Sequence, residues 1–124
     1  HKEKLDSAVF ENHLASSIIR AQRMVYHLAI HCVTGKVTLK QKEKELLQQW
    51  KAYFSDVLNS WLNKDIDKAR ELHHEYKNIG EEGSSIISRG NQPYVLHLIL
   101  SGFRNTYLIT SPLIGLLCFE QENL

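Results

Sequence analysis

The sequence predicts an all-α protein, a single antiparallel up-down-up-down four-helix bundle over residues 1–124 with long first and last helices. Hydrophobic residues recur every three to four positions in four long segments. Short connections containing Gly, Pro, Asn and Asp separate the segments, and the strand-like run Val37-Thr38-Leu39 is too short to form a strand. A hydrophobic content of 43% and a charged content of 23% are ordinary for one globular domain.

Composition limits the classes of function. The formal net charge of +1 gives no basic excess, so we expect no nucleic-acid partner. No apolar run approaches the roughly 20 residues of a membrane span. The chain begins at His1 without a signal-peptide pattern, which predicts an excised domain or a processed product. Cys32 and Cys118 should lie near opposite ends of the bundle, about 30 Å apart by helix rise, and should not be bonded.

The first helix is predicted over residues 4–34, ending where Gly35 takes the left-handed conformation. One of its faces has the three-and-four spacing of a helix packed into a bundle. We expect this face to join the core through Leu14, Ile18, Ala21, Val25, Leu28 and Cys32.

The second helix is predicted to begin after a capping box, with Thr38 as the N-cap and Gln41 reaching back, and to end near Leu62. Its aromatic residues have helical spacing, which favours a core over a ligand cage. The expected core set is Leu46, Leu47, Trp50, Tyr53, Phe54, Val57, Leu58 and Trp61.

The third helix is predicted over about 66–88, with Asp65 or Asp67 placing negative charge at its N-terminus. Gly80 and Gly83 should weaken it locally, and residues 89–93 should break the chain direction. The apolar positions of this helix are Ile66, Ala69, Leu72, Tyr76 and Ile79.

The fourth helix is predicted over about 94–123, interrupted or kinked at Pro112. Its apolar residues cover most of the circumference, which indicates burial on more than one side and favours a partner subunit. They include Val95, Leu96, Leu98, Ile99, Leu100 and Phe103.

A second stripe on the first helix lies roughly 130° away from its core stripe. It contains two arginines flanked by imidazoles and hydroxyls, without a carboxylate, so it is a candidate anion site; a solvated basic face is the alternative. The stripe consists of His13, Ser16, Arg20, Arg23, His27 and His31.

Residues 17–28 resemble the first-helix signature of nitrate/nitrite-sensor (NarX/PilJ-type) extracytoplasmic domains, approximately Asn-x-Ala-Gly-Arg-Gln-Arg-Met-Leu-Ser-Gln-Arg. Three positions match outright, Gln22, Arg23 and Met24, and Val25 is a near match. The departures are Ser17 for Asn, Arg20 for Gly, Ala21 for the first Arg and His27 for Gln.

The resemblance implies the extracytoplasmic, periplasmic sensor domain of a bacterial transmembrane receptor, placed between two membrane helices. Such domains form parallel homodimers through their first helices, and the Arg that aligns with Arg23 binds the anion at the dimer axis. The implied ligand site comprises Arg23, Arg20, His27, Ser16 and Ser17. The departures leave the ligand's identity open, and the output module is open between a kinase, a chemotaxis transducer and a cyclase.

A different class is compatible with His74 and Lys77, which have the His-x-x-Lys spacing of histidine phosphotransfer domains, also four-helix bundles. Those domains place Gly after the Lys, where this chain has Asn78, and a small or apolar residue before the His, where it has His73. A plain helical protein-interaction module is the third alternative.

Other chemistry is sparse. His27 and His31 are four residues apart, so they lie on one helix face, a geometry that can bind zinc. A metalloprotease motif has Glu directly after the first His, whereas this chain has Leu28. We therefore expect no metal and no cofactor. The chain has no glycine-rich phosphate loop and no nucleophile with an obvious base, and it is therefore not expected to be an enzyme.

Overall fold

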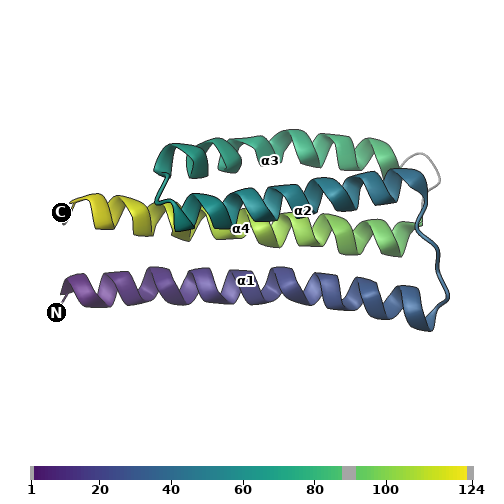
Figure 1. The fold of residues 1–124 in the computed structure, drawn as a ribbon, viewed down its shortest axis with the longest axis horizontal. Coiled ribbons are helices and arrows are strands. Elements are labelled where there is room, and N and C mark those ends of the chain that lie inside the picture. Colours follow the sequence, from purple (N-terminus) through teal and green to yellow (C-terminus); the bar gives the residue numbers. More distant parts are fainter. Residues whose placement is uncertain (1, 88–91, 123–124) are drawn as a thin grey trace.

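The computed structural model describes residues 2–87 and 92–122 and contains four helices there, without a strand. They are α1 (Lys2–Thr34), α2 (Gln41–Leu62), α3 (Ile66–Ile87) and α4 (Pro93–Glu122). The all-α four-helix bundle is therefore confirmed. The start of α1 and the end of α4 lie at the same end of the molecule (Figure 1).

Helix α4 is the central element of the bundle, since its backbone packs against those of α1, α2 and α3. Most of its apolar circumference is thus covered within the chain, although Tyr94 and Leu108 remain 50% and 40% exposed. Helix α1 is attached differently. Among the described residues, no Cα atom of α1 lies within 8 Å of one in α2 or α3, so its backbone packs on α4 alone.

Helices α2 and α4 approach closely at Trp50. Trp50 is buried, and its indole Nε1–H donates to Thr106 Oγ1 at 3.0 Å. A Cβ atom on Gly102 would lie 2.3 Å from the same ring, so only glycine fits beneath it. Nearby, the Tyr53 hydroxyl donates to the Leu72 carbonyl at 2.8 Å and links α2 to α3.

The end of α1 differs from the prediction. Lys36, not Gly35, takes the left-handed conformation (φ 49), while Val37 N–H donates to Cys32 O at 3.1 Å. Gly35 is favoured for another reason, because a Cβ there would lie 2.9 Å from His31 O.

The start of α2 also differs. Its N-cap is Lys40 rather than Thr38, and the Glu43 side chain, not that of Gln41, reaches back to accept from Lys40 N–H at 2.7 Å. Glu43 also accepts from Gln92 N–H at 2.8 Å, so one buried carboxylate fixes the ends of two helices. A carboxylate accepts such bonds more strongly than an amide does, which explains the shift of the helix start.

The remaining connections mostly follow the sequence. Asp65 Oδ1 accepts from Lys68 N–H at 3.0 Å, which confirms the acidic start of α3. Helix α3 is continuous through Gly80 and Gly83, and α4 is continuous through Pro112, so neither predicted interruption ends a helix. Residues 89–91, part of the segment 89–93 that was predicted to break the chain direction, lie outside the described residues.

Both cysteines are free, as predicted from their separation along the bundle. Among the described residues, no helix combines the length and hydropathy that a membrane span would need.

Candidate functional site

The second stripe of α1 faces solvent. Ser16, Arg20, Arg23 and His27 are all exposed, on the side of α1 turned away from the bundle core. Neither arginine forms an ion pair or a side-chain hydrogen bond with any described residue. Their guanidinium donors are therefore available to an external acceptor.

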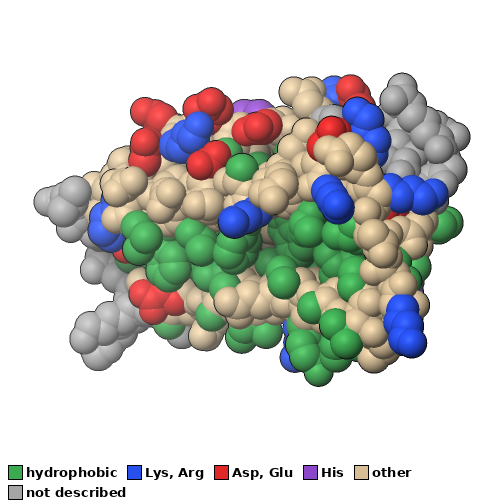
Figure 2. All heavy atoms as spheres, turned by 45° about the vertical axis from the view of Figure 1, so that its right-hand side comes forward, with side chains coloured by type: hydrophobic (Ala, Val, Ile, Leu, Met, Phe, Trp, Pro, Cys, Tyr) green, Lys and Arg blue, Asp and Glu red, His purple; other side chains and the backbone are tan. Residues whose placement is uncertain are grey.

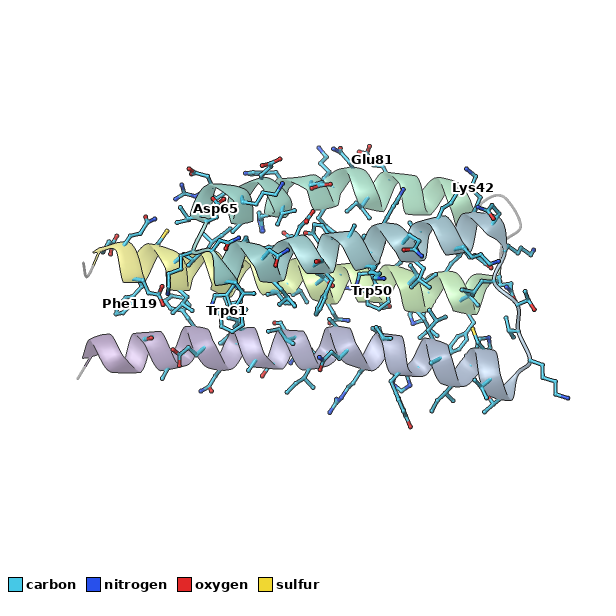
Figure 3. The ribbon with its side chains drawn as sticks, in the orientation of Figure 1. Lys42, Trp50, Trp61, Asp65, Glu81 and Phe119 are labelled. Carbon is cyan, nitrogen blue, oxygen red and sulfur yellow. The ribbon has the colours of Figure 1, made fainter. Side chains whose placement is uncertain are left out.

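Charge is divided unevenly between the helices. The sequence contains no Asp or Glu from residue 12 to residue 42, and none from 92 to 119. These segments make up most of α1 and α4, which pack side by side. Acidic side chains gather mainly on the opposite side of the bundle, along α3 (Figure 2). Glu81 of α3, for example, points away from the other helices (Figure 3).

On α2 and α3, acidic and basic side chains pair locally: Lys42 Nζ lies 3.3 Å from Glu45 Oε2, and Lys68 Nζ lies 3.6 Å from Glu71 Oε1. The α1 stripe has no carboxylate of its own to do this. An anion from solution would meet uncompensated positive charge at Arg20 and Arg23, which is the electrostatic basis of a candidate anion site.

The fold holds two residues of the predicted site, Ser17 from the implied ligand set and His31 from the stripe. Ser17 is only 7% exposed, on the side of α1 that packs into the bundle, and the structure does not bring it to the surface with the arginines. His31 is half-buried, and its ring meets the Tyr94 ring of α4 edge-on, with centroids 4.5 Å apart. The exposed cluster therefore consists of Ser16, Arg20, Arg23 and His27, with His13 beyond it.

An apolar row follows the stripe along α1. Tyr26 is 62% exposed and Val33 is 78% exposed, with Ile19 and Ile30 on the same face. The seven-residue steps from Ile19 to Tyr26 and from Tyr26 to Val33 keep the row on one side of the helix. We call these four residues the outer row. The seven-residue spacing of Ile19, Tyr26 and Val33 is visible in the sequence and could have predicted this row.

The prediction that Val25 belongs to the core stripe of α1 was wrong. Val25 is 53% exposed, because the described Cα atoms of α1 and α2 stay more than 8 Å apart and leave the side of α1 nearest α2 partly uncovered. Ile18 and Cys32 are half-buried, and Leu14, Ala21 and Leu28 are buried as predicted.

The two adjacent histidines of α3 have different environments. His73 packs against α4, where its ring stacks on Tyr107 with centroids 4.7 Å apart. Thr110 donates its single hydroxyl proton to Tyr107 O, so its oxygen can only accept from His73. The 2.8 Å hydrogen bond between His73 Nδ1 and Thr110 Oγ1 therefore requires the imidazole proton to be on Nδ1. His74, in contrast, is exposed, and Lys77 is exposed one turn further along.

Burial raises the pKa of Tyr76, which stacks on Tyr107 with centroids 4.3 Å apart, while nearby Arg104 acts in the opposite direction. This aromatic cluster joins α3 to α4 and has a packing role. As for metals, the described residues contain no group of three or more His, Cys, Asp or Glu side chains arranged to hold an ion.

Comparisons with protein-family models, with curated proteins and with solved structures find no match to this chain.

Proposed function

We propose that this chain is an extracytoplasmic ligand-sensing domain of a bacterial transmembrane signalling receptor, which binds a small anion at an interface formed by α1 of two copies. The observation that carries the proposal is the exposed pair Arg20 and Arg23, in the part of α1 from residue 12 onward that contains no Asp or Glu, and without an ion pair among the described residues. The likeness of residues 17–28 to the sensor signature supports the same assignment.

Arginine suits a small oxyanion because its planar fork can donate two parallel hydrogen bonds to one ligand. Arg20 and Arg23 are three residues apart and so project from one side of α1. His27 and Ser16 lie at the margins and supply further donors.

The outer row supports the dimer. Exposed Ile19, Tyr26 and Val33 form a seam beside Arg23, and a second copy of α1 would remove these side chains from water. In a parallel arrangement the arginines of both copies approach one another. They repel unless an anion lies between them, so the ligand favours one dimer geometry over others.

The attachment of α1 to α4 alone supports a mechanism of relay. A shift of α1 along or around α4 breaks no backbone packing with α2 or α3. The start of α1 and the end of α4 lie together (Figure 1), so such a shift changes the relation between the two ends. Membrane helices attached to both ends would carry that change to a cytoplasmic output module.

The test is thermal stabilisation by a panel of small oxyanions, including nitrate, nitrite and phosphate. Replacing Arg23 by Ala should lower the affinity for the active anion more than tenfold, since hydrogen bonds to a charged group contribute about 1.5–3 kcal/mol each. The apo fold should be unchanged, because the side chain is exposed. Lys44→Ala, an exposed cation on α2, is the matched control.

Two results count against the proposal. Native protein that is stabilised by no anion in the panel excludes the anion site. Equal loss of affinity in the Arg23 and Lys44 variants would mean that the anion responds to the overall charge of the protein and not to a site at Arg23. Sedimentation at high protein concentration, with and without the anion, tests the dimer separately, and a strict monomer in both conditions contradicts it.

A second candidate, histidine phosphotransfer, is supported by the exposure of His74 beside Lys77. In that case a phosphorylated receiver protein would label the native domain, and His74→Gln would abolish the labelling while His73→Gln would instead disturb α3–α4 packing. Absence of labelling of the native domain is the result expected under the sensor proposal.

A further inference from the structure

The gap between α1 and α2 contains a cavity of about 320 Å³. Its walls are apolar: Ala21 and Val25 come from α1, and Leu47, Trp50 and Phe54 come from α2. The cavity lies in the band of hydrophobic side chains visible between α1 and the helices above it (Figure 2). Its volume is at the lower end of the range for small-molecule pockets.

The floor of the cavity is fixed before any ligand arrives. Trp50 is held by the hydrogen bond from its indole to Thr106, and Thr106 in turn donates to Gly102 O at 2.8 Å. The closeness of the ring to Gly102 leaves it little freedom to move. A preformed apolar wall of this kind reduces the cost of ordering on binding.

Three side chains that border the cavity end in polar groups, one of them positively charged. Gln22 of α1 and Gln48 and Lys51 of α2 line it, and all three side chains are exposed. Lys51 forms no ion pair or side-chain hydrogen bond with any described residue. The lining itself is almost entirely carbon, and the flexible ends of these three exposed side chains, an ammonium and two amides, can reach the mouth of the cavity from the solvent; no acidic group is among the lining residues.

We propose that this cavity binds a single-chain alkyl carboxylate, with the chain against Trp50 and Phe54 and the carboxylate at Lys51. The apolar walls select the chain, and the rim charge selects the head group. The proposal does not depend on the anion site of α1.

Calorimetric titration with straight-chain carboxylates of increasing length, each below its micelle concentration, is the first measurement. Each added methylene should tighten binding about fourfold until the cavity is full, after which affinity stops rising. The primary alcohol of the same length should bind about two- to fivefold more weakly, since the ion pair lies at an exposed rim. The alkyltrimethylammonium ion should bind more weakly still.

Variants locate the site. Val25→Trp fills the cavity from an exposed position and should reduce affinity at least about tenfold, equivalent to losing two methylene contacts. Val9→Trp, an exposed valine of α1 that does not line the cavity, should leave binding unchanged. Lys51→Met should remove the preference for carboxylate over alcohol, whereas Lys44→Met should not.

Several outcomes overturn the proposal. They are the absence of chain-length dependence, equal binding of all three head groups, and equal effects of the two tryptophan variants. A Val25→Trp variant that loses dimerisation instead of ligand binding assigns the groove to a second copy. Binding only to phospholipid vesicles assigns it to a bilayer surface. Arg23→Ala should bind the carboxylate normally, so failure of the anion site and failure of this cavity are distinguishable.

Discussion

Helix α1 and the unit formed by α2, α3 and α4 are held in different ways. The three-helix unit combines apolar packing with buried polar links, such as Trp50 to Thr106 and Tyr53 to Leu72. Helix α1 packs on α4 through one face, and no side-chain hydrogen bond joins its described residues to another helix. The exposed candidate sites lie on or beside α1, the helix whose backbone packs against a single neighbour.

The comparison explains why α1 has three distinct surfaces. Leu14 and Leu28 face α4 and are buried, the arginines and the outer row face solvent, and Val25 faces the gap toward α2. A helix enclosed on several sides, such as α4, has little surface left for binding. A helix attached by one face can bind ligands and partners on the others.

Replacing Gly102 by Ala should have the largest effect on the three-helix unit. The new Cβ would lie 2.3 Å from the Trp50 indole, which is buried and hydrogen-bonded and cannot move aside. We expect a loss of about 3 kcal/mol in the free energy of unfolding, even though Ala favours helices over Gly by about 1 kcal/mol. Urea unfolding followed by circular dichroism measures it, and unchanged stability would contradict the packing described.

Replacing Glu43 by Gln should have a somewhat smaller effect. Burial acts to raise the pKa of this carboxyl, but the hydrogen bonds from Lys40 and Gln92 outweigh it and hold the pKa below its ordinary value of 4.5. An amide cannot accept all of these bonds, and we expect a loss of about 2 kcal/mol at neutral pH.

The same variant makes a pH prediction. Because the folded pKa is lowered, the stabilisation by ionised Glu43 is fully present above the unfolded value, near 4.5, and is lost as pH falls through the lower folded value. The stability difference between native protein and Glu43→Gln should therefore be constant near neutrality and should shrink below about pH 4.5. A difference that persists at low pH would refute the role of the charge.

Gly115→Ala is the counterpart of Gly102→Ala at the contact between α1 and α4, and its effect should be the smallest. Its Cβ would lie 2.5 Å from the Phe10 ring, but Phe10 is half-buried and can turn outward. We expect a loss of less than about 1 kcal/mol in the same urea experiment. A loss equal to that of Gly102→Ala would mean that α1 is held as rigidly as α2.

The architecture could be predicted well because the spacing of apolar residues within each segment reflects which face of that helix is buried. The buried positions of α2 and α3, including Trp50, Val57 and Leu72, follow that period. Helix ends were less predictable. The Glu43 carboxylate accepts hydrogen bonds both from the Lys40 N–H at the start of α2 and from the Gln92 N–H. Gln92 is remote in the sequence, so the local pattern around Lys40 does not reveal this arrangement.

The candidate site was predicted in part. The outward orientation of Arg20 and Arg23 follows from their angle to the core stripe. The burial of Ser17 agrees with the helical period, because it lies three residues after Leu14 and four before Ala21, but the resemblance had placed it at the ligand. The exposure of Val25 depends on which helices α1 packs against, and a periodic pattern contains no information on that choice.

Hydrogen exchange of the native protein tests most directly the claim that α1, with one neighbouring helix, is held less firmly than α4, with three. The measurement compares amides near the middle of α1, around residues 14–28, with those near the middle of α4, around 95–113, at a concentration where the protein is monomeric. After correction for intrinsic rates, α1 amides should exchange about tenfold faster or more, through openings that leave α4 protected. Equal protection of the two helices would contradict the account.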